Sequence, residues 1–180
     1  MNVTFTYRGQ ENPNNRIVQI NGARILGGSY RNFSGTPDRF NTNGDREFCF
    51  VIDDPDIADA LKNDLSADGV GWNVKIKPPR EEGDTPFMFL KVKVKFGMRP
   101  PAIYLETDGN MVRLDEDSIG ILDRTDIAYA DLDIRPYDDV MGGRPFRSAY
   151  LQSMKVVQDF SSDRFASQYN EMNNTDTLPI

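Results

Sequence analysis

Residues 87–96 read FMFLKVKVKF and carry aromatic and basic side chains at alternating positions. Because successive side chains of a strand point to opposite faces, one face is apolar and the other has two rings followed by three ammonium groups. This second face consists of Phe87, Phe89, Lys91, Lys93 and Lys95. Aromatic rings stack on bases and lysines neutralise phosphates, so the set suits single-stranded nucleic acid. Lysines on an exposed strand also prevent edge-to-edge aggregation, and this second interpretation stays open.

A strand expected at residues 71–77 (GWNVKIK) repeats the pattern, with Lys75 and Lys77 on the face opposite to Trp72. If it forms a hairpin with residues 87–96 across the proline-rich loop at residues 78–86, all five lysines share one face with the two phenylalanines. Like charges across a ladder repel each other, so a bound anion would stabilise such a face.

The segment of residues 30–46 interleaves aromatic with basic side chains. Its candidates for nucleic-acid binding are Tyr30, Arg31, Phe33, Arg39, Phe40 and Arg46. In one interpretation the segment is a flexible flap over the lysine face. In the other it is a surface loop whose aromatic residues pack into the core, and the sequence favours neither.

A weaker group of candidates lies near the C-terminal end of the expected sheet. It contains Arg135 and Tyr137, followed by Arg144 and Arg147. An ion pair between Arg135 and Asp131 or Asp133 is the structural alternative to a binding role.

The residue types available exclude several kinds of catalysis. The 180-residue chain has no histidine and one cysteine, Cys49, within the apolar run FCFVI, where a buried thiol is expected. Histidine-based triads, zinc sites and an internal disulfide are therefore excluded. Acidic clusters at residues 53–56, 115–117 and 131–133 could hold Mg²⁺ for a nuclease. However, the first fits a helix N-cap, the second the start of a helical turn and the third the solvent side of a strand. We predict no catalytic residue, no metal and no cofactor, with a nuclease as the weakest alternative.

The overall charge limits the choice of partner. A net charge of −7 and a pI near 4.6 argue against a generally basic, duplex-coating protein, although a local basic face remains effective on an acidic body. The N-terminus lacks the pattern of a signal peptide, and no apolar run approaches the roughly 18 residues of a membrane helix. We expect a soluble, intracellular protein without a membrane partner.

The elements that must position these residues are mostly short strands separated by Gly, Pro, Asn and Asp. Strands are expected at residues 16–25, 47–52, 71–77, 87–96, 102–106, 131–137 and 148–158. A short helix is expected after Asp54-Pro55, and a helical turn within residues 114–122. This pattern predicts a mainly β domain over residues 1–160, built as a small barrel or sandwich. Residues 161–180 are expected to form a short helix and a mobile acidic tail.

Four segments resemble those of tailed-bacteriophage early proteins described as single-stranded DNA-binding proteins. They are RNFSGTPDRFNTNGDREFCFVIDD, GWNVKIKPPREEGDTPFMFLKVKVKF, DLDIRPYD and AYLQSMKVVQ, and the similarity covers residues 17–165. The resemblance implies an OB-fold-like small β-barrel that is not an enzyme. It also implies that the protein coats single-stranded DNA during phage replication or recombination, in the cytoplasm of the infected bacterial host. It assigns no individual contacts.

The C-terminus is similar to that of bacterial single-strand-binding proteins, which end in acidic residues followed by an apolar-proline-aromatic finish. The corresponding residues are Asp176, Leu178, Pro179 and Ile180. The similarity implies recruitment of replication or recombination proteins. The chain departs from that pattern by a single acid near its end and by lacking the terminal aromatic residue, and a terminus without function is the alternative.

A second class of function fits the same residues. Exposed aromatic side chains and a positive patch also suit a phage protein-interaction or anti-defence module that binds a host protein or a nucleotide signal. The long loops at residues 27–45 and 78–86 suit ligand binding and subunit contacts equally well, which leaves a homo-oligomer open.

Overall fold

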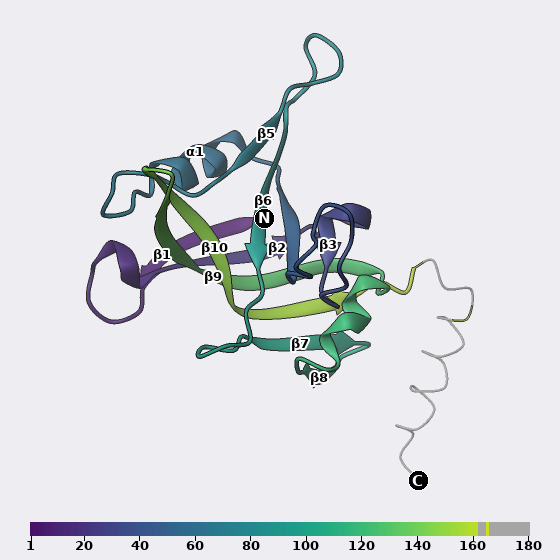
Figure 1. The fold of residues 1–180 in the computed structure, drawn as a ribbon. Coiled ribbons are helices and arrows are strands. Elements are labelled where there is room, and N and C mark those ends of the chain that lie inside the picture. The colour runs from purple at the N-terminus through teal and green to yellow at the C-terminus, as the bar shows by residue number, and fades with distance from the viewer. Residues whose placement is uncertain (162–164, 166–180) are drawn as a thin grey trace.

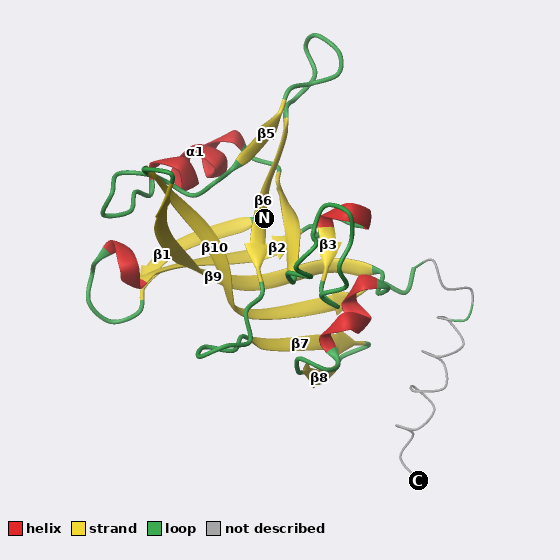
Figure 2. Cartoon of the chain, in the orientation of Figure 1, coloured by secondary structure: helices red, strands yellow, loops and turns green. Residues whose placement is uncertain are grey.

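The computed structural model describes residues 1–161 and residue 165, and within them the chain forms ten strands and one α-helix (Figures 1 and 2). The helix is α1 (Pro55–Asn63), and three short 3-10 helices are η1 (Pro13–Asn15), η2 (Gly28–Tyr30) and η3 (Ile119–Asp123). The strands are β1 (Asn2–Tyr7), β2 (Arg16–Ala23), β3 (Arg31–Asn32), β4 (Glu47–Ile52), β5 (Lys75–Lys77), β6 (Phe87–Lys93), β7 (Ala102–Thr107), β8 (Asn110–Leu114), β9 (Ile127–Met141) and β10 (Arg144–Gln158). The mainly β prediction is confirmed.

The predicted helix and tail at residues 161–180 fall outside the described residues, except for Ser161 and Phe165. This covers the four tail candidates Asp176, Leu178, Pro179 and Ile180, so the division of the chain into two parts stays a prediction. Among the described residues, no helix has both the length and the apolar character needed to span a bilayer.

All ten strands belong to one sheet with the order β1-β2-β9-β10-β6-β4-β3; β5 pairs with β6, and β7 joins β10 to β8. The named strands do not close into a continuous barrel. However, the segment that continues β2 touches β4, because Ile25 forms an isolated bridge with Phe50 and the Leu26 amide donates to the Cys49 carbonyl at 2.9 Å. An OB-fold is a five-stranded, partly open barrel. Strands β2, β9, β10, β6 and β4 form this OB-like arrangement.

The core lies inside this curved sheet and is built from the apolar faces of the strands. The predicted apolar face of residues 87–96 is confirmed, since Met88, Leu90, Val92 and Val94 are all buried. They pack in one cluster with Phe48 and residues of β2, β9 and β10. Because strand side chains alternate between the two faces, the intervening residues of β6 are turned to the outer face of the sheet.

Strands β9 and β10 form the longest hairpin of the sheet, with fifteen residues in each strand. The turn consists of Gly142 and Gly143, both at positive φ (57° and 77°), which glycine adopts without steric cost. Pro136 and Pro145 lie inside the ladder, and proline normally marks the end of a strand, so the predicted strands at residues 131–137 and 148–158 were too short. Gln152 is left out of the register between Leu151 and the next paired residue and forms a β-bulge.

Helix α1 begins as predicted, with Asp54 as the N-cap accepting a hydrogen bond from the Asp56 amide at 2.8 Å. Ala58 and Leu61 are buried on its inner side. The chain that leaves the helix passes so close to its last turn that a Cβ atom on Gly71 would overlap the Lys62 carbonyl group. Glycine is therefore required at this position.

Next to the C-terminal end of the helix, Arg147 is fully buried, and its guanidinium nitrogens all have hydrogen-bond acceptors. Its guanidinium donates to both carboxylate oxygens of Asp138 at 2.8 and 3.0 Å. It also donates to the Pro13 carbonyl at 2.8 Å and to the carbonyl and carboxylate of Asp64 at 3.1 and 3.3 Å. Asp64 also accepts from the indole of Trp72 at 2.8 Å. This network ties the end of α1 to the β9–β10 hairpin and to η1.

Candidate nucleic-acid interface

The register of the sheet brings basic and aromatic side chains together on its outer face. Lys75 and Lys77 of β5 lie opposite Phe89 and Phe87 of β6, so the prediction that these lysines and phenylalanines share one face is confirmed. The same face continues across β10 and β9, because Lys93 pairs with Tyr150 and Tyr150 with Arg135. We call the face formed by these residues, together with Lys91, Tyr137 and Phe146, the outer face.

Two neighbouring cavities hollow the outer face. The loop cavity, of about 420 Å³, lies between η2, the 36–46 loop and the sheet, and its lining includes Tyr30, Phe40 and Phe89. The strand groove, of about 500 Å³, runs over β6, β10 and β9. Its polar and aromatic lining consists of Asn73, Lys75, Lys91, Lys93, Tyr137, Arg144, Phe146, Ser148 and Tyr150. Lys75 and Lys91 line both cavities, so the two form adjoining parts of one positively charged depression.

The lysines of this face differ in how far they are already neutralised. Lys91 lies 3.2 Å from Glu47, and Lys95 lies 3.4 Å from Asp45. Lys77 donates to the Tyr30 hydroxyl at 2.6 Å. Lys75 and Lys93 form no ion pair within residues 1–161. Because exposed ion pairs contribute only about 0–1 kcal/mol, even the paired lysines can exchange a carboxylate for a phosphate at small cost.

Tyr137 and Tyr150 provide the best stacking surface on this face. Their rings are parallel, with 4.8 Å between centroids and 2° between planes, and Phe146 lies 6.4 Å from Tyr137. Tyr137 is 41% exposed, so its ring is open to a base. Its hydroxyl donates to Asp139 at 3.1 Å, and this hydrogen bond raises the pKa of Tyr137.

The prediction that Phe89 is an outward-facing platform for a base is wrong. Phe89 is only 7% exposed, because η2 folds over β6 and places the Tyr30 ring against it at 5.4 Å, edge-on. Phe87 covers another side at 5.4 Å and is itself half-buried. The Lys77 ammonium lies 5.8 Å from the centre of the Phe89 ring. Phe89 therefore forms the floor of the loop cavity.

Within residues 30–46, three candidates have structural roles, which corrects their assignment to binding. Phe33 is fully buried and stacks on Phe48 at 5.0 Å. Arg31 donates to the carbonyls of Leu26, Leu122 and Thr125 at 2.9–3.1 Å. Arg46 donates to the Phe33 carbonyl and pairs with Glu116. These contacts attach the segment to β4 and η3, in contrast to the free flap of the first interpretation.

Phe40, in contrast, is 90% exposed at the rim of the loop cavity. The Asp38 carboxylate accepts hydrogen bonds from the amides of Phe40 and Asn41, both at 2.7 Å, and so fixes the turn that presents the ring. The Arg39 guanidinium lies 5.5 Å from the centre of that ring. An exposed aromatic side chain on an ordered turn is an effective stacking group, because little conformational freedom is lost when a base binds.

Arg135 does not pair with Asp131 or Asp133 among the described residues, so its structural alternative is wrong. Asp131 instead lies 3.6 Å from Lys155. The Arg135 guanidinium lies 5.2 Å from the centre of the Tyr150 ring. It also lines a third cavity with Arg8 and Arg99, two residues that the sequence patterns did not single out. Both lie in loops, and the alternation of side chains along a strand, which the sequence patterns rely on, does not apply to loop residues.

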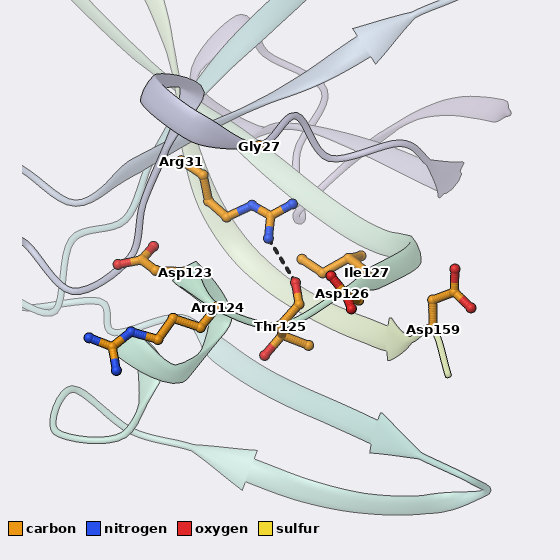
Figure 3. Close-up of a pocket in the computed structure, with 8 residues that line it drawn as sticks. All are labelled: Gly27, Arg31, Asp123, Arg124, Thr125, Asp126, Ile127 and Asp159. Atoms are coloured by element: carbon orange, nitrogen blue, oxygen red, sulfur yellow. Dashed lines mark hydrogen bonds between the residues drawn. The ribbon is translucent and has the colours of Figure 1, made fainter. Parts of the chain in front are cut away.

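A fourth cavity, of about 420 Å³, is unsuited to an anion (Figure 3). Asp123, Asp126 and Asp159 line it, and Arg31 donates to the Thr125 carbonyl there at 2.9 Å. The Asp123 carboxylate already accepts from the amides of Phe33 and Ser34. Within the described residues no group of three His, Cys, Asp or Glu side chains is placed to hold a metal ion.

The remaining acidic and thiol candidates have structural roles. Asp115 accepts from the amides of Asp117 and Ser118 and from the Ser118 hydroxyl, which lowers its pKa. Cys49 is buried, as predicted, and burial raises the pKa of its thiol to about 11. At neutral pH this thiol is protonated, unlike a catalytic thiolate.

Comparison with known proteins connects this geometry to a family. The model of the family described as "Putative phage ssDNA-binding domain" matches residues 9–178. The solved structure of the single-stranded DNA-binding protein from bacteriophage Enc34 is similar, with a TM-score of 0.53 and 10% identity, over 94% of this chain and 99% of that chain. At this identity the likeness shows a shared fold, and it supports the OB-like description.

Two further structures of the Enc34 protein are more distant. A C-terminal truncation has a TM-score of 0.46 and 11% identity, covering 85% of this chain and 93% of that chain. The complex with ssDNA has a TM-score of 0.45 and 12% identity, covering 85% and 95%. No curated protein matches the chain by sequence.

Proposed function

The chain belongs to the phage ssDNA-binding domain family, and we propose on this premise that it binds single-stranded DNA along the outer face. Lys75, Lys91 and Lys93 contact phosphates, while Tyr137 and Phe40 stack on bases. The observation that carries the proposal is the adjoining pair of cavities, in which these ammonium groups and exposed rings line one depression. Contacts to phosphates and to the planes of bases are independent of sequence, so the binding has low sequence specificity.

The geometry favours single strands over duplexes. Stacking on Tyr137 or Phe40 requires a base whose face is free, whereas the bases of a duplex are already stacked on one another. The net charge of −7 also opposes binding of duplex DNA over the rest of the surface, since acidic side chains repel phosphates. Electrostatic attraction is therefore limited to the local basic face.

The proposal extends to the biological role. In this proposal the protein coats single-stranded DNA without a catalytic step of its own and acts in phage replication or recombination, in the cytoplasm of the infected bacterial host. Recruitment of replication or recombination proteins through Asp176, Leu178, Pro179 and Ile180 stays part of this proposal.

Fluorescence anisotropy with the full chain and labelled single- and double-stranded oligonucleotides tests the proposal across a salt titration. The triple substitution Lys75→Glu, Lys91→Glu, Lys93→Glu removes three phosphate contacts. Each contact contributes about 0.7 to the slope of log K against log salt for single strands, so the slope should fall by about 2. The matched control carries the same change of charge at exposed positions away from the outer face: Lys62→Glu, Arg113→Glu and Arg124→Glu.

The possible outcomes separate the alternatives. Equal affinity of the triple variant and the native protein would show that the DNA binds elsewhere. If the native protein binds no single strand even at low salt, the result favours the alternative in which the outer face binds a host protein or a nucleotide signal. Degradation of DNA on addition of Mg²⁺ or Mn²⁺ would indicate a nuclease.

A further inference from the structure

A cavity of about 280 Å³ at the end of the outer face collects four arginines from separate parts of the chain. Arg8 follows β1, Arg16 begins β2, Arg99 lies in the loop between β6 and β7, and Arg135 belongs to β9. The other lining residues are Asn14, Asn15, Ile17, Pro136 and Gln152. None of the described residues that line this cavity is a carboxylate, in contrast to the cavity in Figure 3.

Only one of the four arginines has its charge neutralised nearby. Arg16 lies 2.9 Å from Asp64 and 4.1 Å from the centre of the Tyr7 ring. Arg8, Arg99 and Arg135 form no ion pair with any residue that the structure describes, and we call their cavity the arginine pocket. Arg8 and Arg99 lower the pKa of Arg135, in addition to the larger effect of its burial. Three like charges are therefore held close together, and an anion between them would reduce their repulsion.

Arg135 supplies a second, independent observation. Its Nε atom is buried and has no hydrogen-bond acceptor among the described residues. A buried donor without an acceptor costs about 1–3 kcal/mol, and few such groups persist in folded proteins. An oxygen of a bound anion is a suitable acceptor, because guanidinium groups bind the oxygens of phosphates through two parallel hydrogen bonds.

We infer that Arg8, Arg99 and Arg135 form a phosphate site that receives a backbone phosphodiester of the same DNA strand that stacks on Tyr137. The inference rests on the proposed function. Arg135 connects the two regions, since its guanidinium lies over Tyr150 and Tyr150 stacks on Tyr137 in the strand groove. A strand that leaves the tyrosine pair toward β2 therefore passes this pocket. The site extends the DNA path across the whole width of β9 and β10.

The double variant Arg8→Ala, Arg99→Ala tests this site, because both side chains lie in loops and outside the core. Their loss should reduce the slope of log K against log salt by about 1.4, at about 0.7 for each contact. The matched control is Arg113→Ala, Arg124→Ala, with the same loss of charge on exposed residues elsewhere. Melting temperatures of both variants should equal that of the native protein.

The length of the DNA gives a second readout. The site size of one OB-fold ranges from about 4 to 16 nucleotides, so a 4-mer fills the strand groove alone and a 16-mer also reaches the arginine pocket. The double variant should bind the 4-mer as the native protein does and the 16-mer more weakly. Equal losses for both lengths would overturn the assignment of the pocket to one end of the path.

Further arms distinguish the source of the phosphate. Circular single strands, 5′-hydroxyl and 5′-phosphorylated linear 16-mers should bind equally if the pocket takes an internal phosphodiester. Tighter binding of the 5′-phosphorylated strand, lost in the double variant, would assign the pocket to a strand end instead. Binding of millimolar inorganic phosphate to the native protein and not to the double variant, with equal DNA affinity of the two, would assign the pocket to a free anion.

The failure of this inference can be told apart from the failure of the proposed function. If the native protein binds no single-stranded DNA, the proposed function fails. If the native protein binds DNA and the double variant has the same affinity and salt slope, the arginine pocket alone is wrong. Loss of self-association in the double variant, measured by sedimentation without DNA, would instead assign the pocket to carboxylates of a second copy, for which the acidic loop at residues 78–86 is available.

Discussion

The β9–β10 hairpin carries arginines of opposite character on its two faces, a single buried one inside and one of a cluster outside. On the inner face, Arg147 makes five hydrogen bonds to Asp138, Asp64 and Pro13 and is fully buried. On the outer face, Arg135 meets Arg8 and Arg99 without a carboxylate among the described lining residues. The charge of Arg147 is neutralised by its carboxylate partners, and this buried network stabilises the fold. The charges of Arg8, Arg99 and Arg135 are not neutralised by any described residue that lines their cavity, and they are therefore available to an anionic ligand.

The lysines of the outer face show the same contrast on a smaller scale. Lys91 and Lys95 have carboxylate partners, whereas Lys75 and Lys93 have none within the described residues. We therefore expect the partners of a cation in this protein to set how much of its charge is available to a ligand, from Arg147, which is buried among acceptors, through Lys91 to Lys93.

Arg147→Met should have the largest effect, and it should be on stability. Removing the guanidinium leaves the Asp138 carboxylate without its ion-pair partner and takes one of two arginines from Asp64, which keeps Arg16. Loss of a buried partner costs about 3–5 kcal/mol in comparable sites. Urea denaturation measures this loss. Arg144→Met, three residues away and exposed, should change the free energy of unfolding by less than about 0.5 kcal/mol. Equal stability of the two variants would contradict a structural role for Arg147.

Tyr137→Ala should weaken single-stranded DNA binding and leave stability nearly unchanged. Loss of one stacked base costs about 1–3 kcal/mol, or roughly 5- to 150-fold in affinity. Tyr129 offers a close control, because it is also on β9 and is 40% exposed, but it does not line the strand groove. Anisotropy titrations of Tyr137→Ala, Tyr137→Phe and Tyr129→Ala should show a loss only in the first. A similar loss in Tyr129→Ala would remove the special role of the tyrosine pair.

Lys93→Ala should lower the salt slope by about 0.7, as expected for one lost phosphate contact. Lys91→Ala should lower it by less, since Glu47 already neutralises part of that charge. Glu47→Gln should do the reverse and increase affinity, because it frees Lys91 for DNA. Salt titrations of the three variants measure the differences, and identical slopes for the two lysine variants would argue against the influence of partners.

The smallest effect is expected at Cys49, whose uncharged thiol lines the loop cavity and should react slowly with an alkylating reagent at neutral pH. With a thiol pKa of about 11, alkylation by iodoacetamide should be slow at pH 7.5 and accelerate toward pH 11. The folded-state pKa is above the ordinary value of 9.0, so ionisation opposes folding and any destabilisation appears only as the pH rises from 9 toward 11. Mass spectrometry follows the labelling. Rapid alkylation at neutral pH would show an accessible thiolate.

Local patterns predicted the parts of the fold that depend on neighbours in sequence. The strand at residues 47–52 and the start of α1 at Asp54-Pro55 agree with the structure, because alternation and capping are local properties. The apolar face of β6 and the shared face of the lysines were also predictable from alternation. Strands β1, β3 and β8 were missed; β3, only two residues long, is recognised by its pairing with β4 and not by its own pattern.

The site was less predictable, because alternation shows which face a residue occupies and not what covers that face. Phe89 is on the predicted face but lies under Tyr30 and Phe87. Phe33 is in a loop, yet it belongs to the core. Arg8 and Arg99 are more than ninety positions apart in the sequence and meet only through the order of the strands. Such meetings depend on long-range pairing, which has no signature in a single short segment.

The bulge at Gln152 has a consequence for how this chain can vary among relatives. Before it, the inward residues of β10 are Arg147, Ala149 and Leu151; after it, they are Met154 and Val156. The extra residue thus exchanges odd for even positions and keeps Lys155 on the outside, where it lies near Asp131. A single insertion or deletion in this strand would exchange its buried and outward-facing side chains over one of its halves. We expect β10 to tolerate many substitutions during evolution but to change its length on either side of Gln152 only by two residues at a time.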